Sequence, residues 1–191
     1  MKTPESHITV AIVEAPDSDP NEVWDLGFWQ LDMFTEEVIA ELETIAWAEG
    51  NEYPNNYSVG ARSGRLNWGA SGSFSEIILQ VGTGTAAGVG APAITAAIKS
   101  VYQKLKKRAQ RESLESAPTI EDAEQLAKAR IHEHYHVAMD RLTVIRSEIA
   151  TESHRYDFEF SSEDGRKFGA TVGAIEGISS CTRIWSEGNQ P

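Results

Sequence analysis

The chain has a single cysteine, Cys181, among its 191 residues. One cysteine excludes a disulfide within the chain and a zinc site built from several cysteines of one chain. Basic residues are also scarce: 17 Lys and Arg stand against 29 Asp and Glu, and the formal net charge is -12. This balance argues against a general nucleic-acid binder, which needs clustered Lys and Arg to contact phosphates. It permits a basic partner, or mimicry of a nucleic acid.

Internal repeats and a G-x-S-x-G nucleophile motif are missing from the sequence, and no secretory leader is expected. The apolar run from Ile8 to Val13 is too short for the hydrophobic region of a signal peptide and is followed by acidic residues. A 40% share of hydrophobic residues is enough to build a core. We therefore expect a cytoplasmic protein with a single α+β domain over 1–191, with a subdivision into 1–112 and 119–191 as an alternative.

The N-terminal third mixes strand and helix signals. His7–Glu14 is rich in β-branched residues and predicts a strand. The aromatic spacing within Val23–Phe34 suits a short helix or a loop that caps the core. Thr35 is predicted to cap a helix that ends at Gly50. A hairpin turning at Ser63-Gly64 is expected next, with strands Tyr57–Arg62 and Arg65–Trp68.

An uncharged, glycine-rich run then leads into a basic helix. Glu76–Val81 fits either a buried strand or the start of a helix, whereas Ala93–Arg111 predicts a helix with one apolar stripe. Gly82, Gly84 and the glycines that follow resemble a dinucleotide-binding loop, but the acidic residue expected about 20 residues later is missing. The run Ile77–Ile98 is nearly long enough to span a bilayer, so a membrane-active protein is one alternative function.

The last third of the chain predicts a second helix and an antiparallel sheet. Thr119 is expected to cap this helix, whose apolar stripe continues to Leu142. Alternating hydrophobic residues and a turn at Glu163–Arg166 then predict four strands. These strands are Leu142–Glu148, Tyr156–Phe160, Lys167–Val172 and Thr182–Trp185. The predicted fold is α+β, with helices on an antiparallel sheet, a central Gly/Ala-rich helix and C-terminal β-hairpins.

The second helix carries HEHYH, which matches the zinc motif H-E-x-x-H. On a helix, His132 and His136 would share a face and could both bind zinc, with Glu133 polarising a metal-bound water. Asp140 lies one turn further and could be a third ligand. A zinc-dependent hydrolase is therefore an alternative function, and a solvated helix face without any cofactor is the more economical interpretation.

The order of the segments resembles a known family. A Trp-bearing segment is followed by GTGTAAGVGAPAITAAIKSVYQKLKKR and then by the hairpin RYDFEFSSEDGRKFGATV. This pattern is similar to the effector-associated constant component modules of bacterial conflict systems. The resemblance implies a non-catalytic adaptor, sensor or inhibitor encoded beside an effector such as an ATPase or a protease.

Taken together, these features favour a binding module whose partner is another protein, without direct nucleic-acid contact. Its candidate contact groups are exposed aromatic residues and a basic row on the Ala93–Arg111 helix. Trp and Arg side chains often contribute most of the binding energy at protein interfaces. These groups are Trp24, Trp29, Trp68, Lys104, Lys107, Arg108 and Arg111. The oligomeric state does not follow from the sequence.

Overall fold

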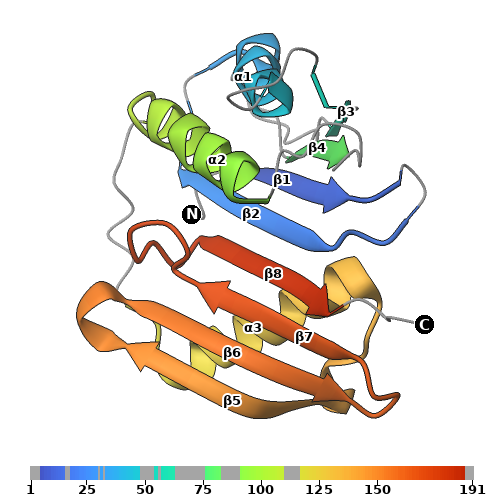
Figure 1. The fold of residues 1–191 in the computed structure, drawn as a ribbon. Helices are drawn as coiled ribbons and strands as arrows, with labels where there is room; N and C mark the ends of the chain where they lie inside the picture. The colour runs from blue at the N-terminus through green and yellow to red at the C-terminus, as the bar shows by residue number, and fades with distance from the viewer. Residues whose placement is uncertain are drawn as a thin grey trace. The chain divides into compact units, whose positions relative to one another are not determined.

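The computed structural model describes residues 5–15, 18–29, 31, 33–47, 54–55, 57–62, 76–82, 91–109 and 117–187. Within these residues the chain forms three α-helices and eight β-strands, and most strand pairs are antiparallel, which confirms the predicted α+β class (Figure 1). The chain divides into two compact units. The first comprises Met1–Ser18 and Leu26–Ser113, and the second comprises Asp19–Asp25 and Leu114–Pro191.

The first unit is built around a short mixed sheet. Strand β1 (Glu5–Val13) runs parallel to β4 (Glu76–Gly82), and Ile8, Val10 and Ile12 of β1 are buried. Strand β3 (Tyr57–Arg62) pairs antiparallel with β4. The predicted hairpin partner of β3 is therefore corrected: β3 pairs with β4, and Arg65–Trp68 lies outside the described residues.

Strand β2 (Glu22–Trp29) corrects the prediction of a helix or loop over Val23–Phe34. The aromatic residues Trp24 and Phe28 are four residues apart, a spacing that fits one helical turn but is also twice the strand period of two. Both side chains and Leu26 between them are buried. Every residue from Glu22 to Phe28 is buried, so this segment is a strand covered on both faces and lacks the alternation that would have indicated a strand.

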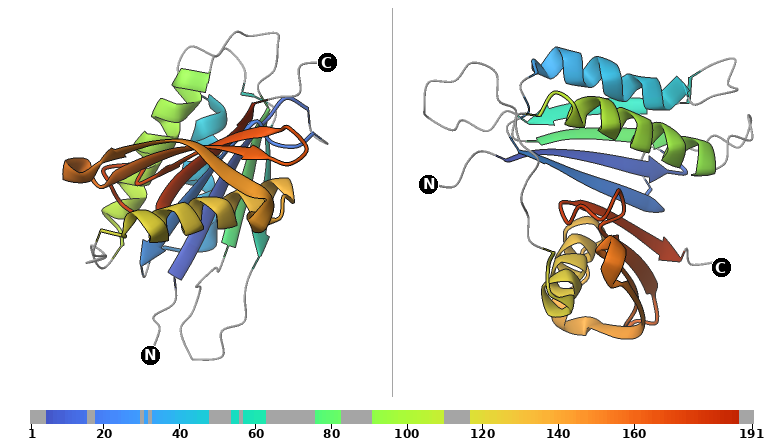
Figure 2. Two further views of the ribbon diagram at one scale, coloured as in Figure 1. Left: turned by 90° about the horizontal axis from the view of Figure 1, so that it is seen from below. Right: turned by 90° about the vertical axis from the view of Figure 1, so that its left-hand side faces the viewer.

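Two helices of the first unit lie side by side over its strands (Figure 2). Helix α1 (Thr35–Glu43) continues into the 3-10 turn η1 (Thr44–Trp47), and α2 (Ala91–Lys106) packs against this turn. Thr35 is the first helical residue and not the cap, because Phe34 occupies the cap position and its amide donates to the Glu37 carboxylate at 3.3 Å. The predicted apolar stripe of α2 is buried at Ile94, Ile98, Val101, Tyr102 and Leu105.

The second unit is a four-stranded antiparallel sheet with one helix on one face. The strands are β5 (Leu142–Ala150), β6 (Arg155–Ser162), β7 (Lys167–Val172) and β8 (Cys181–Glu187), ordered β8-β7-β6-β5. All four predicted strands are confirmed. Helix α3 (Ile120–Tyr135) begins at the predicted cap Thr119, whose hydroxyl accepts from the Asp122 amide at 3.1 Å.

Alternating burial decides which face of this sheet α3 covers. Tyr156, Phe158 and Phe160 of β6 are buried, whereas the residues between them point to the other face. Helix α3 contacts β6, β7 and β8, and its buried residues are Ala123, Ala127, Ile131 and Tyr135. Burying each large side chain in this core contributes roughly 1.5–3 kcal/mol. The opposite face of the sheet keeps the polar residues, and the candidate site lies there.

Helix α3 ends earlier than the sequence pattern predicts. His136 has a φ of 56°, which is left-handed, and its amide donates to the His132 carbonyl oxygen at 3.0 Å. Leu142 is buried as predicted, but it belongs to β5 and not to the helix. Buried residues can follow one another past the end of a helix, because the next strand contributes to the same core although its backbone conformation differs.

Candidate functional site

Two rows of side chains cross the face of the second-unit sheet that lies opposite α3. One row is aligned by strand register as Glu148, Asp157, Thr171 and Arg183. The neighbouring row is Arg146, Glu159, Gly169 and Trp185. Opposite side chains in an antiparallel sheet stand about 5 Å apart, so each row forms a continuous strip of contacts.

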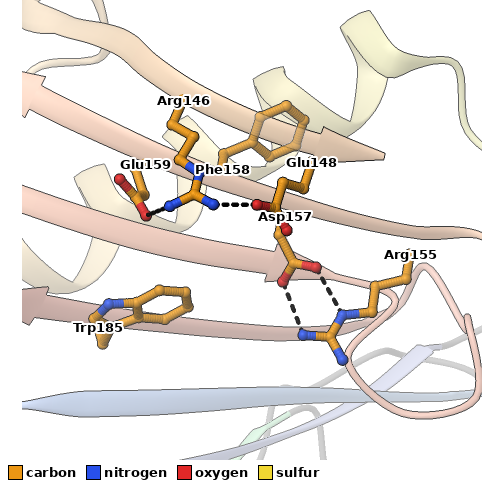
Figure 3. A pocket seen from close by; sticks show the side chains of 7 residues that line it. All are labelled: Arg146, Glu148, Arg155, Asp157, Phe158, Glu159 and Trp185. Atoms are coloured by element: carbon orange, nitrogen blue, oxygen red, sulfur yellow. Dashed lines mark hydrogen bonds and ion pairs between the residues drawn. The ribbon is translucent and has the colours of Figure 1, made fainter. Parts of the chain in front are cut away.

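A hollow of about 250 Å³ is cut into this face (Figure 3). Its lining comes from three strands of the second unit and combines five charged residues with Trp185 and with Phe158, whose side chain is buried on the α3 side of β6. These are Arg146, Glu148, Arg155, Asp157, Phe158, Glu159 and Trp185. Two arginines stand against three carboxylates, so the lining carries one net negative charge.

The tryptophan of the hollow is positioned by a glycine. Trp185 lies across Gly169, where an added Cβ atom would come within 2.0 Å of the indole ring carbons. A residue larger than glycine at this position would force the ring away from the sheet. Gly169 therefore allows a flat, half-buried aromatic ring to form one side of the hollow.

The charged residues of the hollow are partly paired with one another. Arg155 donates two hydrogen bonds to Asp157, at 2.8 and 3.0 Å, and this contact raises the pKa of the Arg155 guanidinium. The Thr171 hydroxyl donates to the same carboxylate at 2.5 Å. Asp157 is thus engaged on both oxygens and is poorly placed to take a proton from a substrate.

One arginine is shared between two glutamates. Arg146 pairs with Glu148 on its own strand, and its Nη1 atom lies 3.6 Å from Oε1 of Glu159 on β6 (Figure 3). The three side chains are 61, 65 and 48% exposed. Exposed pairs of this kind contribute only about 0–1 kcal/mol each, so they can rearrange when a ligand arrives. The excess carboxylate beside Trp185 favours a cationic ligand.

A second aromatic contact adjoins the hollow within the same unit. The Arg183 guanidinium lies 5.0 Å from the Trp185 ring centroid and 5.6 Å from that of Trp24. It also donates two hydrogen bonds to Glu22, at 2.9 and 2.7 Å. Trp24 donates to Glu22 as well, at 2.5 Å, and is only 2% exposed. The prediction of Trp24 as an exposed contact group is therefore wrong; it is a buried support for Arg183.

The predicted basic row belongs to the first unit and is partly neutralised there. Lys104 of α2 lies 3.0 Å from Glu41 of α1, and Arg108, two residues past the end of α2, lies 3.9 Å from Glu37. Lys107 is exposed just beyond the end of α2. Arg111 and Trp68 lie outside the described residues, as does the side chain of Trp29. Among the predicted contact groups that the structure describes, Lys104, Lys107 and Arg108 belong to the first unit and Trp24 to the second.

The HEHYH segment contributes a buried pair of a different kind. His134 Nε2 lies 3.2 Å from Oδ2 of Asp25, whose side chain is 7% exposed, and Arg130 lies 3.6 Å from the same oxygen. Burial opposes protonation of His134, but the Asp25 hydrogen bond and charge outweigh it and raise the pKa of the imidazole. Neither residue was singled out from the sequence, since their partnership depends on a contact across 109 positions.

The predicted zinc residues are arranged differently from a helical H-E-x-x-H site. His132 remains on α3, with Nδ1 2.9 Å from the Val137 carbonyl oxygen, whereas His136 lies past the helix end. Glu133 forms an ion pair with Arg130 at 2.7 Å, and Asp140 is exposed in the turn η2 (Met139–Arg141). Among the described residues no three His, Cys, Asp or Glu side chains gather as a metal site. Zinc binding stays a prediction for experiment.

Comparison with protein-family models, curated proteins and solved structures finds no match for this chain. Within the described residues no helix is both long and apolar enough to cross a membrane. The glycine-rich residues 83–90 lie outside the described part of the chain. The site has therefore to be interpreted from its own geometry.

Proposed function

We propose that this chain is a non-catalytic binding module that receives a basic segment of a partner protein on the hollowed face of its β5–β8 sheet. The observation that carries the proposal is the lining of the hollow, in which Trp185 lies among three carboxylates and two arginines. An aromatic ring beside excess negative charge attracts a Lys or Arg side chain, as Trp185 already does with Arg183 at 5.0 Å, and an exposed contact of this type contributes about 0.5–1 kcal/mol.

The net charge of the whole chain also favours a basic partner. A net charge of -12 attracts positively charged partners and raises their rate of association. The family resemblance supports a role as an adaptor, sensor or inhibitor in a bacterial defence or toxin-linked system in the cytoplasm. In that role the basic segment would belong to the effector protein.

An NMR titration with two short peptides, one rich in arginine and one rich in glutamate, tests this proposal. We expect the arginine peptide to shift the indole N–H resonance of Trp185 in a saturable way and the glutamate peptide to leave it unchanged. Equal shifts with both peptides, or shifts confined to other surfaces, would reject the hollow as a site for cations.

Two matched variants separate local recognition from overall charge. Glu159→Gln removes a carboxylate of the hollow, whereas Glu163→Gln removes an exposed carboxylate from the neighbouring hairpin turn. Both change the net charge by one. We expect only Glu159→Gln to weaken binding of the arginine peptide, by about fivefold to tenfold. Equal weakening would mean that the peptide senses net charge alone.

A further inference from the structure

Strand β5 ends the strand order of the second unit, and among the described residues it pairs with β6 alone. An edge strand exposes backbone N–H and C=O groups that can pair with another strand. Two of its side chains, Ile145 and Ile149, are 52 and 38% exposed, although isoleucine is usually buried. The edge therefore offers both hydrogen-bonding groups and apolar side chains.

We infer that β5 pairs antiparallel with β5 of a second copy of this chain, about a two-fold axis at Ser147. Such a contact uses the same patch on both copies, as two-fold dimers require. It joins the sheets of two second units at their edges. The inference goes beyond the proposed binding of a basic segment, because it concerns self-association through the sheet edge, although Arg146 and Glu148 also line the hollow.

The sequence of β5 is complementary to itself in this one register. With Ser147 at the axis, Arg146 of each copy stands opposite Glu148 of the other, and Ile145 stands opposite Ile149. Opposite charges and apolar pairs facing each other across antiparallel strands each stabilise the pairing. The two contacts occur twice, once on each side of the axis.

Neighbouring registers lose this match. An axis at Arg146 places that arginine opposite itself, and an axis at Glu148 does the same for the glutamate, so like charges would meet. Displacing one strand along the other by a single residue would place residues of the α3 face of one copy opposite residues of the hollowed face of the other. Charge and alternation therefore select the axis at Ser147.

The irregular part of β5 does not remove this edge. The register with β6 shifts between Val144 and Arg146, so Ile145 is the extra residue of a β-bulge. Bulges and charges often protect edges from pairing. Here the residues from Arg146 to Ala150 pair regularly with β6, and the two charges are of opposite sign, so they attract a second copy in the antiparallel register.

Reversing the charge of Arg146 or Glu148 in the full chain tests the dimer. Sedimentation velocity and native mass spectrometry distinguish one chain of 21.0 kDa from two. We expect a wild-type dimer. Arg146→Glu alone places two glutamates opposite each other, and Glu148→Arg alone places two arginines together, so each variant should weaken self-association by about tenfold or more. An equimolar mixture of the two variants should form a dimer containing one of each.

The mixture is decisive because a variant that had lost the dimer through misfolding would not regain it on mixing. Only complementary charges across the interface would restore the dimer. A monomeric wild type, or a mixture that stays monomeric, would overturn the inference. Ile145→Glu should also weaken the dimer, whereas Ile120→Glu, at an isoleucine of α3 with the same exposed fraction of 52%, should not. Trp185→Ala should leave the dimer intact while abolishing the peptide response, so the two proposals fail separately.

Discussion

The indole ring of Trp185 occupies the space in which Gly169 would carry a side chain, since a Cβ atom there would stand 2.0 Å from the ring. The two residues face each other in the β7–β8 register. This contact defines the shape of the hollow, because it fixes how far the aromatic ring rises above the sheet.

Gly169→Ala should therefore lower the free energy of unfolding by about 1–3 kcal/mol, as overpacked sites do, and should displace Trp185. Gly60→Ala is the matched control, because Gly60 also lies in a strand but has no atom within 4 Å of an added Cβ. Urea unfolding and tryptophan fluorescence measure both effects. Equal behaviour of the two variants would show that Trp185 is not held by Gly169.

The His134–Asp25 contact predicts a pH dependence of stability. Because the pKa of folded His134 is raised above 6.5, the pair stabilises the fold fully below about pH 6.5 and less as the pH rises through the folded value. We expect this contribution to be lost as the pH rises from slightly acidic to basic values.

Urea unfolding over this pH range measures the difference between wild type and Asp25→Asn. The variant should lose the His134-dependent part of the slope, whereas His136→Gln, at an exposed histidine, should keep it. A slope unchanged by Asp25→Asn would mean that the buried carboxylate does not stabilise the protonated imidazole.

The turn between β6 and β7 contains an unusually acidic carboxyl group, that of Asp164. The Ser162 hydroxyl, the Arg166 amide and the Arg166 guanidinium all donate to Asp164, and they lower its pKa to about 2. Because the folded pKa is depressed, this carboxylate stabilises the turn above about pH 3.8, and the effect is lost as the pH falls through about 2.

An NMR titration of the Asp164 side-chain carbon should show this low pKa in wild type and a higher value in Ser162→Ala, which removes the first of these donors. Identical titration of both proteins would contradict the assignment of Ser162 as the main cause.

Zinc content tests the remaining alternative for HEHYH. The α3 helix ends before His136, so we expect protein purified without a His tag to carry no stoichiometric zinc by elemental mass spectrometry. The double variant His132→Ala/His136→Ala should then have the same zinc content as wild type. One zinc per chain, lost in this variant, would instead restore the hydrolase hypothesis, and Glu133→Gln would test its catalysis.

The second unit could largely be predicted from sequence because its signals are local. Alternation along Tyr156–Phe160, the turn at Glu163–Arg166 and the Thr119 cap each depend on neighbouring residues. Strand β2 could not be predicted in this way, because a spacing of four between Trp24 and Phe28 satisfies both helix and strand.

The site was harder to predict because register assembles it. Arg146, Glu159, Gly169 and Trp185 come from four strands, and their alignment depends on a bulge in β5 that no single segment indicates. The alternating polar positions of the C-terminal strands were the available signal. They indicated which residues face away from the core, but not which ones meet.

The most direct test of the central proposal is photo-crosslinking in cells, with a photoreactive amino acid in place of Arg155 in the hollow, which leaves its three carboxylates intact, or of Glu121 on α3. Both positions are exposed, and they belong to different faces of the second unit. We predict one discrete crosslinked protein at position 155, attached through a Lys- or Arg-rich segment, and its loss in Trp185→Ala. Equal crosslinking at both positions, or attachment through an acidic segment, would contradict the proposal.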